Sequence, residues 1–264
     1  MWPLRVLLGI VGAAALGVIL FRLVFVPWGM RWGATPAERE AVMAGDTLLE
    51  EDAWDRRRLV MTRATSVAVP PETVWHWVAQ LGRGAGFYSY DRIDNGGKTS
   101  ARHIVSWVPT LALGDASAIG YLRHVEPGVE LVWWVPGERF LGAETRMVID
   151  ARLAPDADRT RLTIRVSGDA RGRSARPVLW LFAVVDSLMA RRQLLGIRDR
   201  AEAFGARLED PERPETGARD QFQRYEVVFA AGDRAGVPGK ERAGLWHERA
   251  IHDLGARFGS LVGS

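Results

Sequence analysis

The sequence contains no cysteine, and this absence excludes several kinds of site at once. Disulfide bonds, thiolate nucleophiles, cysteine-ligated zinc and iron–sulfur clusters all require that side chain. A large excess of one charge is also missing, because the net charge is only +3 although the sequence pI is about 9.7. This modest excess of arginine is not the dense basic surface of a nucleic-acid-binding protein, so we expect no nucleic-acid partner.

What is present is the composition of an ordinary globular chain. The 264 residues are 47% hydrophobic and 25% charged. That length is enough for one large domain or two small ones with a sizeable core. The composition excludes a wholly disordered, a collagenous or a multi-span membrane protein.

The first long apolar run covers residues 6–26 and predicts a transmembrane anchor. At about 1.5 Å per residue it would span the hydrocarbon layer of a bilayer. Arg22 is its only charge, and Trp2 and Trp28 flank it as interfacial anchors do. A cleaved signal peptide is the alternative. We favour an uncleaved anchor over residues 1–28, because a signal peptide has a shorter apolar region followed by small residues.

The charges that flank this run predict its orientation. Arg5 precedes it, whereas Arg22, Arg31 and Arg39 lie near or beyond its end. The positive-inside rule therefore favours a cytoplasmic position for the rest of the chain. We expect a single-pass membrane protein.

A connecting segment over residues 29–58 leads from the anchor to the main domain. Thr35-Pro36-Ala37-Glu38 has the pattern of a capping box with proline at the first helical position, which predicts a short helix over 36–44. A β-branched stretch at 60–69 then predicts a strand. The apolar spacing after Pro71 predicts a helix over 71–81.

Several short strands and one long helix follow. Turn residues at Glu126-Pro127-Gly128, Pro136-Gly137 and 155–158 separate stretches typical of strands. These stretches cover 116–125, 129–135, 144–154 and 160–167, and 103–107 is a further short candidate. Their spacing predicts an antiparallel meander. The final helix is predicted over 177–207, with one apolar stripe formed by Val178, Leu181, Phe182, Val185, Leu188, Met189 and Leu195.

Strands and helices that are segregated along the chain indicate an α+β domain, here residues 59–209. We expect a curved antiparallel sheet to wrap around the long C-terminal helix. Such a sheet leaves a hollow that one helix does not fill, and concave apolar hollows are the usual sites of small molecules.

Three motifs give the chain a family resemblance over residues 59–209. They are Val69-Pro70-Pro71-Glu72-Thr73-Val74-Trp75, Gly86-Phe87-Tyr88-Ser89-Tyr90-Asp91, and Leu194-Leu195-Gly196-Ile197-Arg198-Asp199-Arg200-Ala201-Glu202. The chain resembles the START/birch-allergen/polyketide-cyclase (SRPBCC) superfamily, in particular its membrane-anchored bacterial members of unassigned function. The resemblance implies a helix-grip fold with a hydrophobic cavity and a location at the plasma membrane of a bacterium. It does not imply one activity, because the superfamily includes lipid carriers, hormone receptors and cyclases.

Aromatic residues are the best candidates for the lining of such a cavity. Tyr88 and Tyr90, with Asp91 beside them, lie in a glycine-rich loop that we expect at the cavity mouth. Trp133 and Trp134 are adjacent, so a strand directs them to opposite faces and at most one lines the hollow. The predicted ligand-binding residues are Phe87, Tyr88, Tyr90, Asp91, Trp107, Tyr121, Trp133 and Met147.

Three apparent motifs do not have the spacing that their chemistry needs. The glycines at 82, 84 and 86 follow a helix, whereas a phosphate-binding loop follows a strand. His247 and His252 are five residues apart and do not share one helix face for zinc. Asp91 and Asp94 do not have the alternating ligands of a calcium loop. We therefore predict no metal, no cofactor and no catalytic residue, since nothing brings His103 and Glu130 together as acid and base.

Residues 210–264 lie outside the resemblance, and we expect an extension there that is either partly disordered or an amphipathic helix. The leading hypothesis is a membrane-tethered binding or carrier module whose partner is a hydrophobic, lipid-like small molecule. One alternative is a cyclase-like, aromatase-like or hydrolase-like enzyme that uses the cavity tyrosines. Another is a structural envelope protein with no ligand.

Overall fold

The computed structural model describes residues 2–49, 57–105 and 110–209, so the predicted extension 210–264 lies outside it. The helices are α1 (Trp2–Leu20), the π-helical turn η1 (Phe21–Phe25), α2 (Val26–Met30), α3 (Pro36–Glu40), the 3-10 turn η2 (Thr47–Leu49), α4 (Pro71–Ala79), α5 (Asp91–Asp94) and α6 (Ala175–Glu209). The strands are β1 (Arg57–Val67), β2 (Ala116–Ser117), β3 (Gly120–Glu126), β4 (Glu130–Phe140), β5 (Ala143–Asp156) and β6 (Arg159–Arg171).

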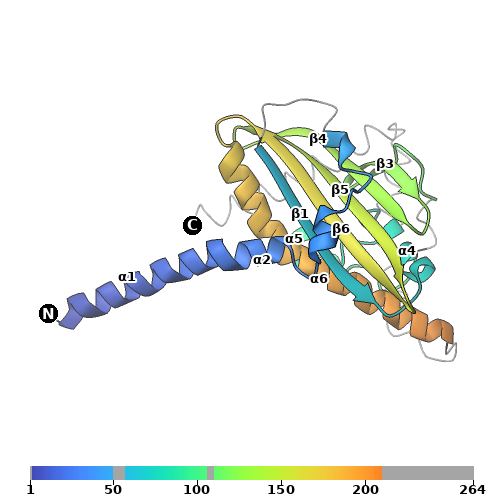
Figure 1. The fold of residues 1–264 in the computed structure, drawn as a ribbon, viewed down its shortest axis with the longest axis horizontal. Coiled ribbons are helices and arrows are strands. Elements are labelled where there is room, and N and C mark those ends of the chain that lie inside the picture. Colours follow the sequence, from blue (N-terminus) through green and yellow to red (C-terminus); the bar gives the residue numbers. More distant parts are fainter. Residues whose placement is uncertain (1, 50–56, 106–109, 210–264) are drawn as a thin grey trace.

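The strands form one antiparallel sheet in the order β1-β6-β5-β4-β3-β2. Strands β2 to β6 follow one another in sequence and in space, which confirms the predicted meander. The first strand, β1, pairs with the last, β6, and closes the other edge. In Figure 1 the long helix α6 crosses one face of this sheet diagonally. The α+β helix-grip architecture is thus the one that the sequence predicts.

The turn predicted at Pro136-Gly137 is wrong. Strand β4 continues to Phe140, and its register with β5 shifts between Val135 and Glu138. Such a bulge absorbs a proline that cannot donate to the ladder, and it bends the strand. The reversal comes instead at Leu141-Gly142, where both residues have positive φ, 49° and 78°.

Two other boundaries differ from expectation. Helix α3 ends at Glu40 and not at residue 44, although the predicted capping box of Thr35 and Glu38 is present. Residues 103–105 are not in a strand, and the rest of that candidate, including Trp107, lies outside the described residues.

The face of the sheet that α6 covers, here called the inner face, holds the main core. Helix α6 packs on β1, β5 and β6, and α4 packs on α6. The fully buried side chains of this core include Met61, Trp77, Tyr88, Leu122, Trp133, Leu162, Leu194 and Ile197. At about 25 cal/mol per Å² of buried apolar surface, these large residues dominate the stability of the domain.

The predicted apolar stripe of α6 is wrong in part. Leu181, Val185 and Leu188 are 40%, 41% and 48% exposed, and the buried side consists of Val178, Leu179, Ala183, Ala190, Leu194 and Ile197. The first half of α6 is apolar around most of its circumference, so its hydrophobic period does not identify the face that packs on the sheet.

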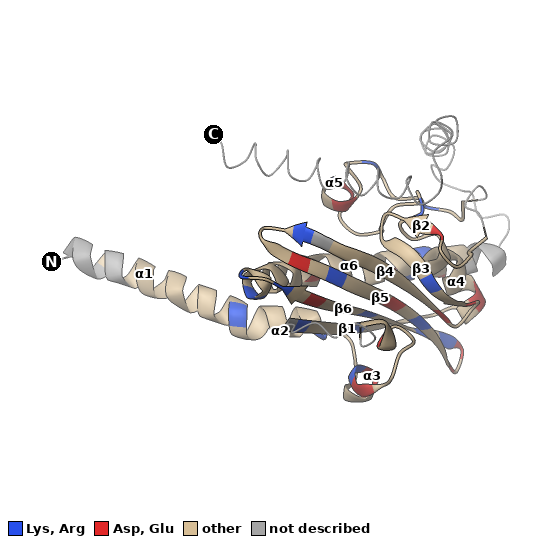
Figure 2. Ribbon diagram, turned by 90° about the horizontal axis from the view of Figure 1, so that it is seen from above, with Lys and Arg blue, Asp and Glu red and all other residues tan. Residues whose placement is uncertain are grey.

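The opposite face of the sheet, here called the outer face, is covered by residues 34–49, which we call the strap. Figure 2 shows α3 of the strap on one side of the sheet and α4 and α5 on the other. Leu49 of the strap packs on Val132 and Val148 in a small second core. Both faces of the sheet are therefore partly covered, one by helices and one by the strap.

The N-terminal helix extends away from the domain (Figure 1). Residues Gly9–Met30 form a helix long and apolar enough to cross a membrane, and it is almost entirely exposed. A membrane span and a signal sequence share this length and composition. Only its last part contacts the domain: Val26 is buried, and a Cβ at Gly29 would overlap Ser187 of α6.

Candidate functional site

The interior between the inner face and α6 is the site that the sequence predicted. Alternation along the strands directs Trp133 and Met147 inward. Trp133 lies opposite Leu122 on β3 and Ile149 on β5. Met147 lies opposite Gly168, next to Leu179 of α6. Both residues therefore project from the inner face of the sheet toward α6.

The two adjacent tryptophans lie on opposite faces, as predicted. Trp133 is buried in the inner core, with 1% of its surface exposed. Trp134 packs with Val132 and Val148 on the outer face, where the Arg146 guanidinium lies 5.9 Å from the centre of its ring. The pair therefore provides a natural comparison between an inner and an outer indole.

An aromatic cluster lies where α4 meets the C-terminal half of α6. The ring of Trp77 meets the ring of Tyr88 edge-on at 5.8 Å and that of Phe204 at 6.2 Å. Edge-to-face pairs of this kind add about 0.5–1.5 kcal/mol to the burial of their area. The sequence analysis placed Trp77 on a helix but did not identify it as a site residue.

Tyr88 is not at the mouth of the interior. It is 2% exposed and its backbone has a φ of 58°. Its hydroxyl accepts a hydrogen bond from Gln80 Nε2 at 2.7 Å. The Arg200 guanidinium lies 4.8 Å from the centre of its ring, and burial is the main cause that lowers the pKa of Arg200. A Cβ at Gly196 would overlap the Tyr88 carbonyl oxygen.

The loop around Tyr88 is fixed to α6 by several hydrogen bonds. Gln193 donates to the Phe87 carbonyl at 3.1 Å, and Ser89 donates to the Met189 carbonyl at 3.2 Å. Arg200 donates to the Ala101 carbonyl at 2.9 Å. Gly196 and Arg200 also contact Tyr88, so two of the three sequence motifs, the aromatic loop and the helix ending, contact each other directly.

The other predicted loop residues do not converge with the Tyr88 hydroxyl. Phe87 is half-buried at the edge of the core, and Tyr90 is 46% exposed. Asp91 closes the loop, because its carboxylate accepts from the Ser100 amide at 3.0 Å and from the Ser100 hydroxyl at 2.5 Å. The structure therefore does not assemble the two tyrosines and Asp91 into one polar centre.

Two further predicted residues lie elsewhere. Tyr121 pairs with Trp134 and so projects toward the outer face, away from α6. Trp107 lies outside the described residues. Glu130 also projects outward, whereas His103 lies in the loop that contacts Gln80 on the inner side. The sheet thus separates the two residues considered as an acid–base pair.

Two buried indole groups of the interior have no hydrogen-bond partner. These are Nε1 of Trp77 and Nε1 of Trp133, each with almost no accessible surface. Leaving a buried donor unpaired costs about 1–3 kcal/mol, and native proteins do so rarely. An indole nitrogen only donates. The interior therefore presents two N–H groups that an oxygen acceptor would satisfy.

Arg63 is a charged residue of the inner face that sequence reasoning missed. It is fully buried, and its guanidinium pairs with Asp186 of α6 at 2.5 Å and donates to the Gly29 carbonyl at 2.8 Å. One signal was available: Arg63 shares the inward alternation of Met61 and Val67. Nothing in that pattern shows which residue would neutralise it.

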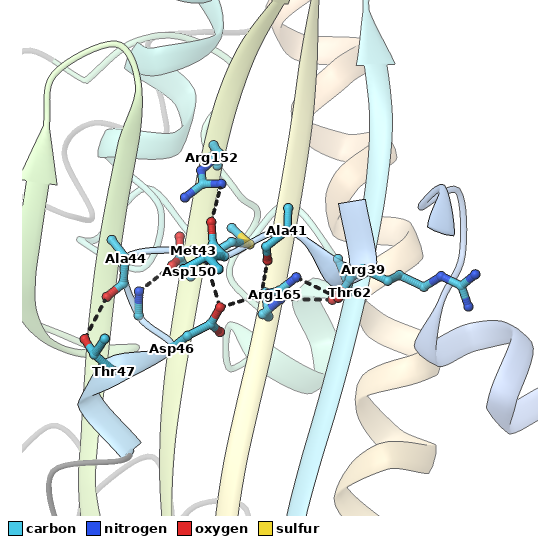
Figure 3. A network of polar contacts seen from close by, with 12 residues as sticks. Arg39, Ala41, Met43, Ala44, Asp46, Thr47, Thr62, Asp150, Arg152 and Arg165 are labelled. Carbon is cyan, nitrogen blue, oxygen red and sulfur yellow. Dashed lines mark hydrogen bonds and ion pairs between the residues drawn. The ribbon is translucent and has the colours of Figure 1, made fainter. Parts of the chain in front are cut away.

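The outer face carries an arginine-rich network that holds the strap (Figure 3). Arg165 of β6 donates to the carbonyl oxygens of Glu38, Arg39 and Ala41 at 2.8–3.0 Å. It also pairs with Asp46 at 2.7 Å. Its neighbour Arg161 pairs with Glu38 at 2.6 Å, and the hydrogen bond from Arg161 is the main cause that lowers the pKa of Glu38 to about 2.

A pair of carboxylates on the outer face completes this network. Asp150 accepts from the Gly45 amide of the strap at 2.7 Å, and burial raises its pKa to about 8. Burial also acts to raise the pKa of Glu130, but hydrogen bonds from Arg152, Asp150 and the Ala44 amide outweigh it and lower that pKa. These groups bind the chain's own strap, which indicates a structural role.

Within the residues that the structure describes, no group of three or more histidine, aspartate and glutamate side chains is arranged to hold a metal ion. Two polar pairs of the interior, Tyr88–Gln80 and Arg63–Asp186, are satisfied within the protein itself. The indole donors of Trp77 and Trp133 have no such partner.

Comparisons with known proteins give similarity of fold alone. No family model matches the chain, and no curated protein matches it. Similar solved structures include protein NE0264 from Nitrosomonas europaea, with 14% identity over 56% of this chain and 97% of that one and a TM-score of 0.39. Ara h 8.0201 has 11% identity over 56% and 97%, with a TM-score of 0.36. DynU16, from the dynemicin biosynthetic locus, has 18% identity over 60% and 49%, with a TM-score of 0.30.

Proposed function

We propose that this chain is a membrane-tethered binding or carrier protein that holds a hydrophobic, lipid-like molecule between the inner face of the sheet and α6. The observation that supports it most is the pair of buried, unpartnered indole N–H groups of Trp77 and Trp133 in an otherwise apolar interior. A ligand with a hydrocarbon body and an oxygen acceptor complements both features.

The geometry favours binding over catalysis by the tyrosines. The Tyr88 hydroxyl accepts a hydrogen bond from Gln80, and the Tyr90 side chain is about half exposed to solvent. The Asp91 carboxylate accepts a hydrogen bond from the Ser100 amide within its own loop. General acid–base chemistry needs groups within hydrogen-bonding reach of a common reacting atom, and these three do not share one.

The tether is supported by the N-terminal helix. Residues Gly9–Met30 are apolar and exposed, and only the last part of this helix contacts the domain. An exposed apolar surface of this size is stable in a bilayer and unfavourable in water. A carrier held at the membrane in this way would meet lipid-like molecules where they are most concentrated.

Native mass spectrometry of the full chain tests the proposal. The protein is extracted in detergent, delipidated and mixed with palmitic acid, its methyl ester or hexadecane. We expect bound adducts with the acid and the ester, which carry oxygen acceptors, and fewer with hexadecane, which has none. The absence of adducts with all three probes, in protein whose circular dichroism shows the fold intact, would contradict it.

A further inference from the structure

The surface to explain is an exposed apolar patch on the first half of α6. Trp180, Leu181, Val185 and Leu188 are each 40–48% exposed. They lie on the side of α6 that faces away from the sheet, since the buried side is formed by residues such as Ala183, Ala190 and Leu194. Large exposed apolar patches mark surfaces that bind another body.

The end of the N-terminal helix crosses this part of α6 at a steep angle (Figure 1), and α2 is the part of it that packs on α6. The Arg22 guanidinium lies 5.5 Å from the centre of the Trp180 ring, and Gly29 packs directly on Ser187. Arg191 then lies over the ring of Trp32 at 5.2 Å. The end of the N-terminal helix therefore meets α6 at the level of the exposed patch.

This docking fixes where the domain begins relative to a membrane. Helix α1 has 19 residues, which at about 1.5 Å per residue matches the thickness of a hydrocarbon layer. Arg22 lies two residues beyond Leu20, the last residue of α1, at the level where a cation reaches the headgroups. If α1 spans the bilayer, Trp180 and Leu181 lie at its surface.

The charges near the patch fit a lipid surface. Arg173, Arg176, Arg191 and Arg192 are exposed around the patch on α6 and the turn before it. The one acidic residue in the first half of α6, Asp186, is neutralised by Arg63. An apolar helix face with arginines at its ends and an interfacial tryptophan is the pattern of a helix that lies in the headgroup region.

We propose that the exposed face of α6 formed by Trp180, Leu181, Val185 and Leu188 lies on the surface of the same bilayer that α1 crosses. The tether then does not leave the domain free to swing, and the domain rests on the membrane along the helix that forms one wall of its interior. This inference rests on the proposed tether, and its test separates the two.

The natural absence of cysteine allows single-cysteine labelling of the full chain. Leu181→Cys and Val185→Cys report on the patch, and Leu16→Cys reports on the span. Asp158→Cys is the control, because it lies in the β5–β6 turn. That turn lies beside the end of β1, because Val67 pairs with Thr160. The next residue, Ala68, contacts Glu202 near the other end of α6, far from the patch. Each variant is labelled with a nitrobenzoxadiazole fluorophore and reconstituted in phosphatidylcholine–phosphatidylglycerol vesicles that contain nitroxide-bearing lipid.

If α6 lies on the bilayer, nitroxides near the headgroups quench the labels at 181 and 185 at least about twofold more than the label at 158. The label at 16 is quenched more by nitroxides deep in the acyl chains. Quenching at 16 with labels at 181 and 185 that behave like 158 would overturn the inference and leave the tether intact. No quenching at 16 would overturn the tether and the inference together.

Discussion

Arg63 on β1 and Asp186 on α6 form a buried ion pair that joins the sheet to the helix across it. The same guanidinium donates to the Gly29 carbonyl at the end of the apolar N-terminal helix. One side chain therefore links three elements: the edge strand, the long helix and the N-terminal helix. Because Arg63 is fully buried, its charge depends on Asp186 for compensation.

Removing Asp186 alone should destabilise the domain strongly. We expect Asp186→Ala to lower the free energy of unfolding by about 3–5 kcal/mol, since it leaves a buried guanidinium without a counter-ion. The double variant Arg63→Met/Asp186→Leu should lose clearly less. Urea denaturation of the full chain in detergent micelles, followed by tryptophan fluorescence, measures both.

The control for this prediction is Asp199→Ala, which breaks the solvent-exposed pair of Arg198 and Asp199. Exposed pairs contribute about 0–1 kcal/mol, so this variant should remain close to the wild type. Equal losses for Asp186→Ala and Asp199→Ala would show that the buried pair has no special role.

The carboxylate that holds the strap should make stability depend on pH. Burial raises the pKa of Asp150 to about 8 in the folded chain from 3.8, so the folded state binds more protons than the unfolded state between these values. Stability therefore falls as pH rises through this window and levels off above about 8. Asp150→Asn, which is neutral at every pH, should remove this part of the dependence.

Unfolding free energies of the wild type and Asp150→Asn, measured at intervals between pH 5 and pH 8.5, about the range of the raised pKa, test this. The difference between them should shift in favour of the variant as pH rises. A difference that is constant with pH would mean that the Asp150 carboxyl is ionised throughout the window.

The contact between the aromatic loop and α6 predicts a sensitive glycine. Because a Cβ at Gly196 would overlap the Tyr88 carbonyl oxygen, Gly196→Ala must displace the loop or the helix. We expect a loss of about 1–3 kcal/mol, the range for overpacked sites, although alanine favours the helix intrinsically. Gly17→Ala in α1, where nothing lies within 4 Å, should leave the unfolding of the domain unchanged.

The adjacent tryptophans allow a matched test of the ligand site. Trp133→Phe removes the inner, unpartnered indole donor, and Trp134→Phe makes the same change on the outer face. Fluorescence titration with a dansyl-labelled fatty acid should show weaker binding for Trp133→Phe by about 5- to 10-fold, the value of one hydrogen bond of 1–1.4 kcal/mol. Binding by Trp134→Phe should match the wild type, and equal losses in both variants would place the ligand elsewhere.

The architecture could be predicted because its signals are local. Alternating strands, turn residues and the capping box at Thr35 reveal themselves within a few residues, and the meander follows from short connections. The prediction of a turn at Pro136-Gly137 was wrong because proline and glycine occur in bulges as well as in turns. Only the pairing of β4 with β5 distinguishes a bulge from a turn there.

The site could be predicted only in part, because it depends on contacts between distant segments. Alternation placed Trp133 and Trp134 on opposite faces, but it could not show that the Tyr88 hydroxyl would be occupied by Gln80. The prediction of the buried face of α6 was wrong in part because leucine and valine lie around most of the first half of the helix. Their spacing therefore does not show which of them pack on the sheet. The buried charge of Arg63 is compensated by Asp186, which lies far from it in the sequence, so the pair could not be predicted from local patterns.

The most direct test of the central claim is photo-cross-linking of the full chain, reconstituted in vesicles, with a diazirine-bearing fatty acid. Peptide mass spectrometry then locates the adducts. The account predicts adducts on inner-face peptides of β4 and β5, around Trp133 and Met147, that compete away with excess palmitic acid. Adducts confined to residues 9–30, or adducts that palmitic acid does not displace, would contradict it.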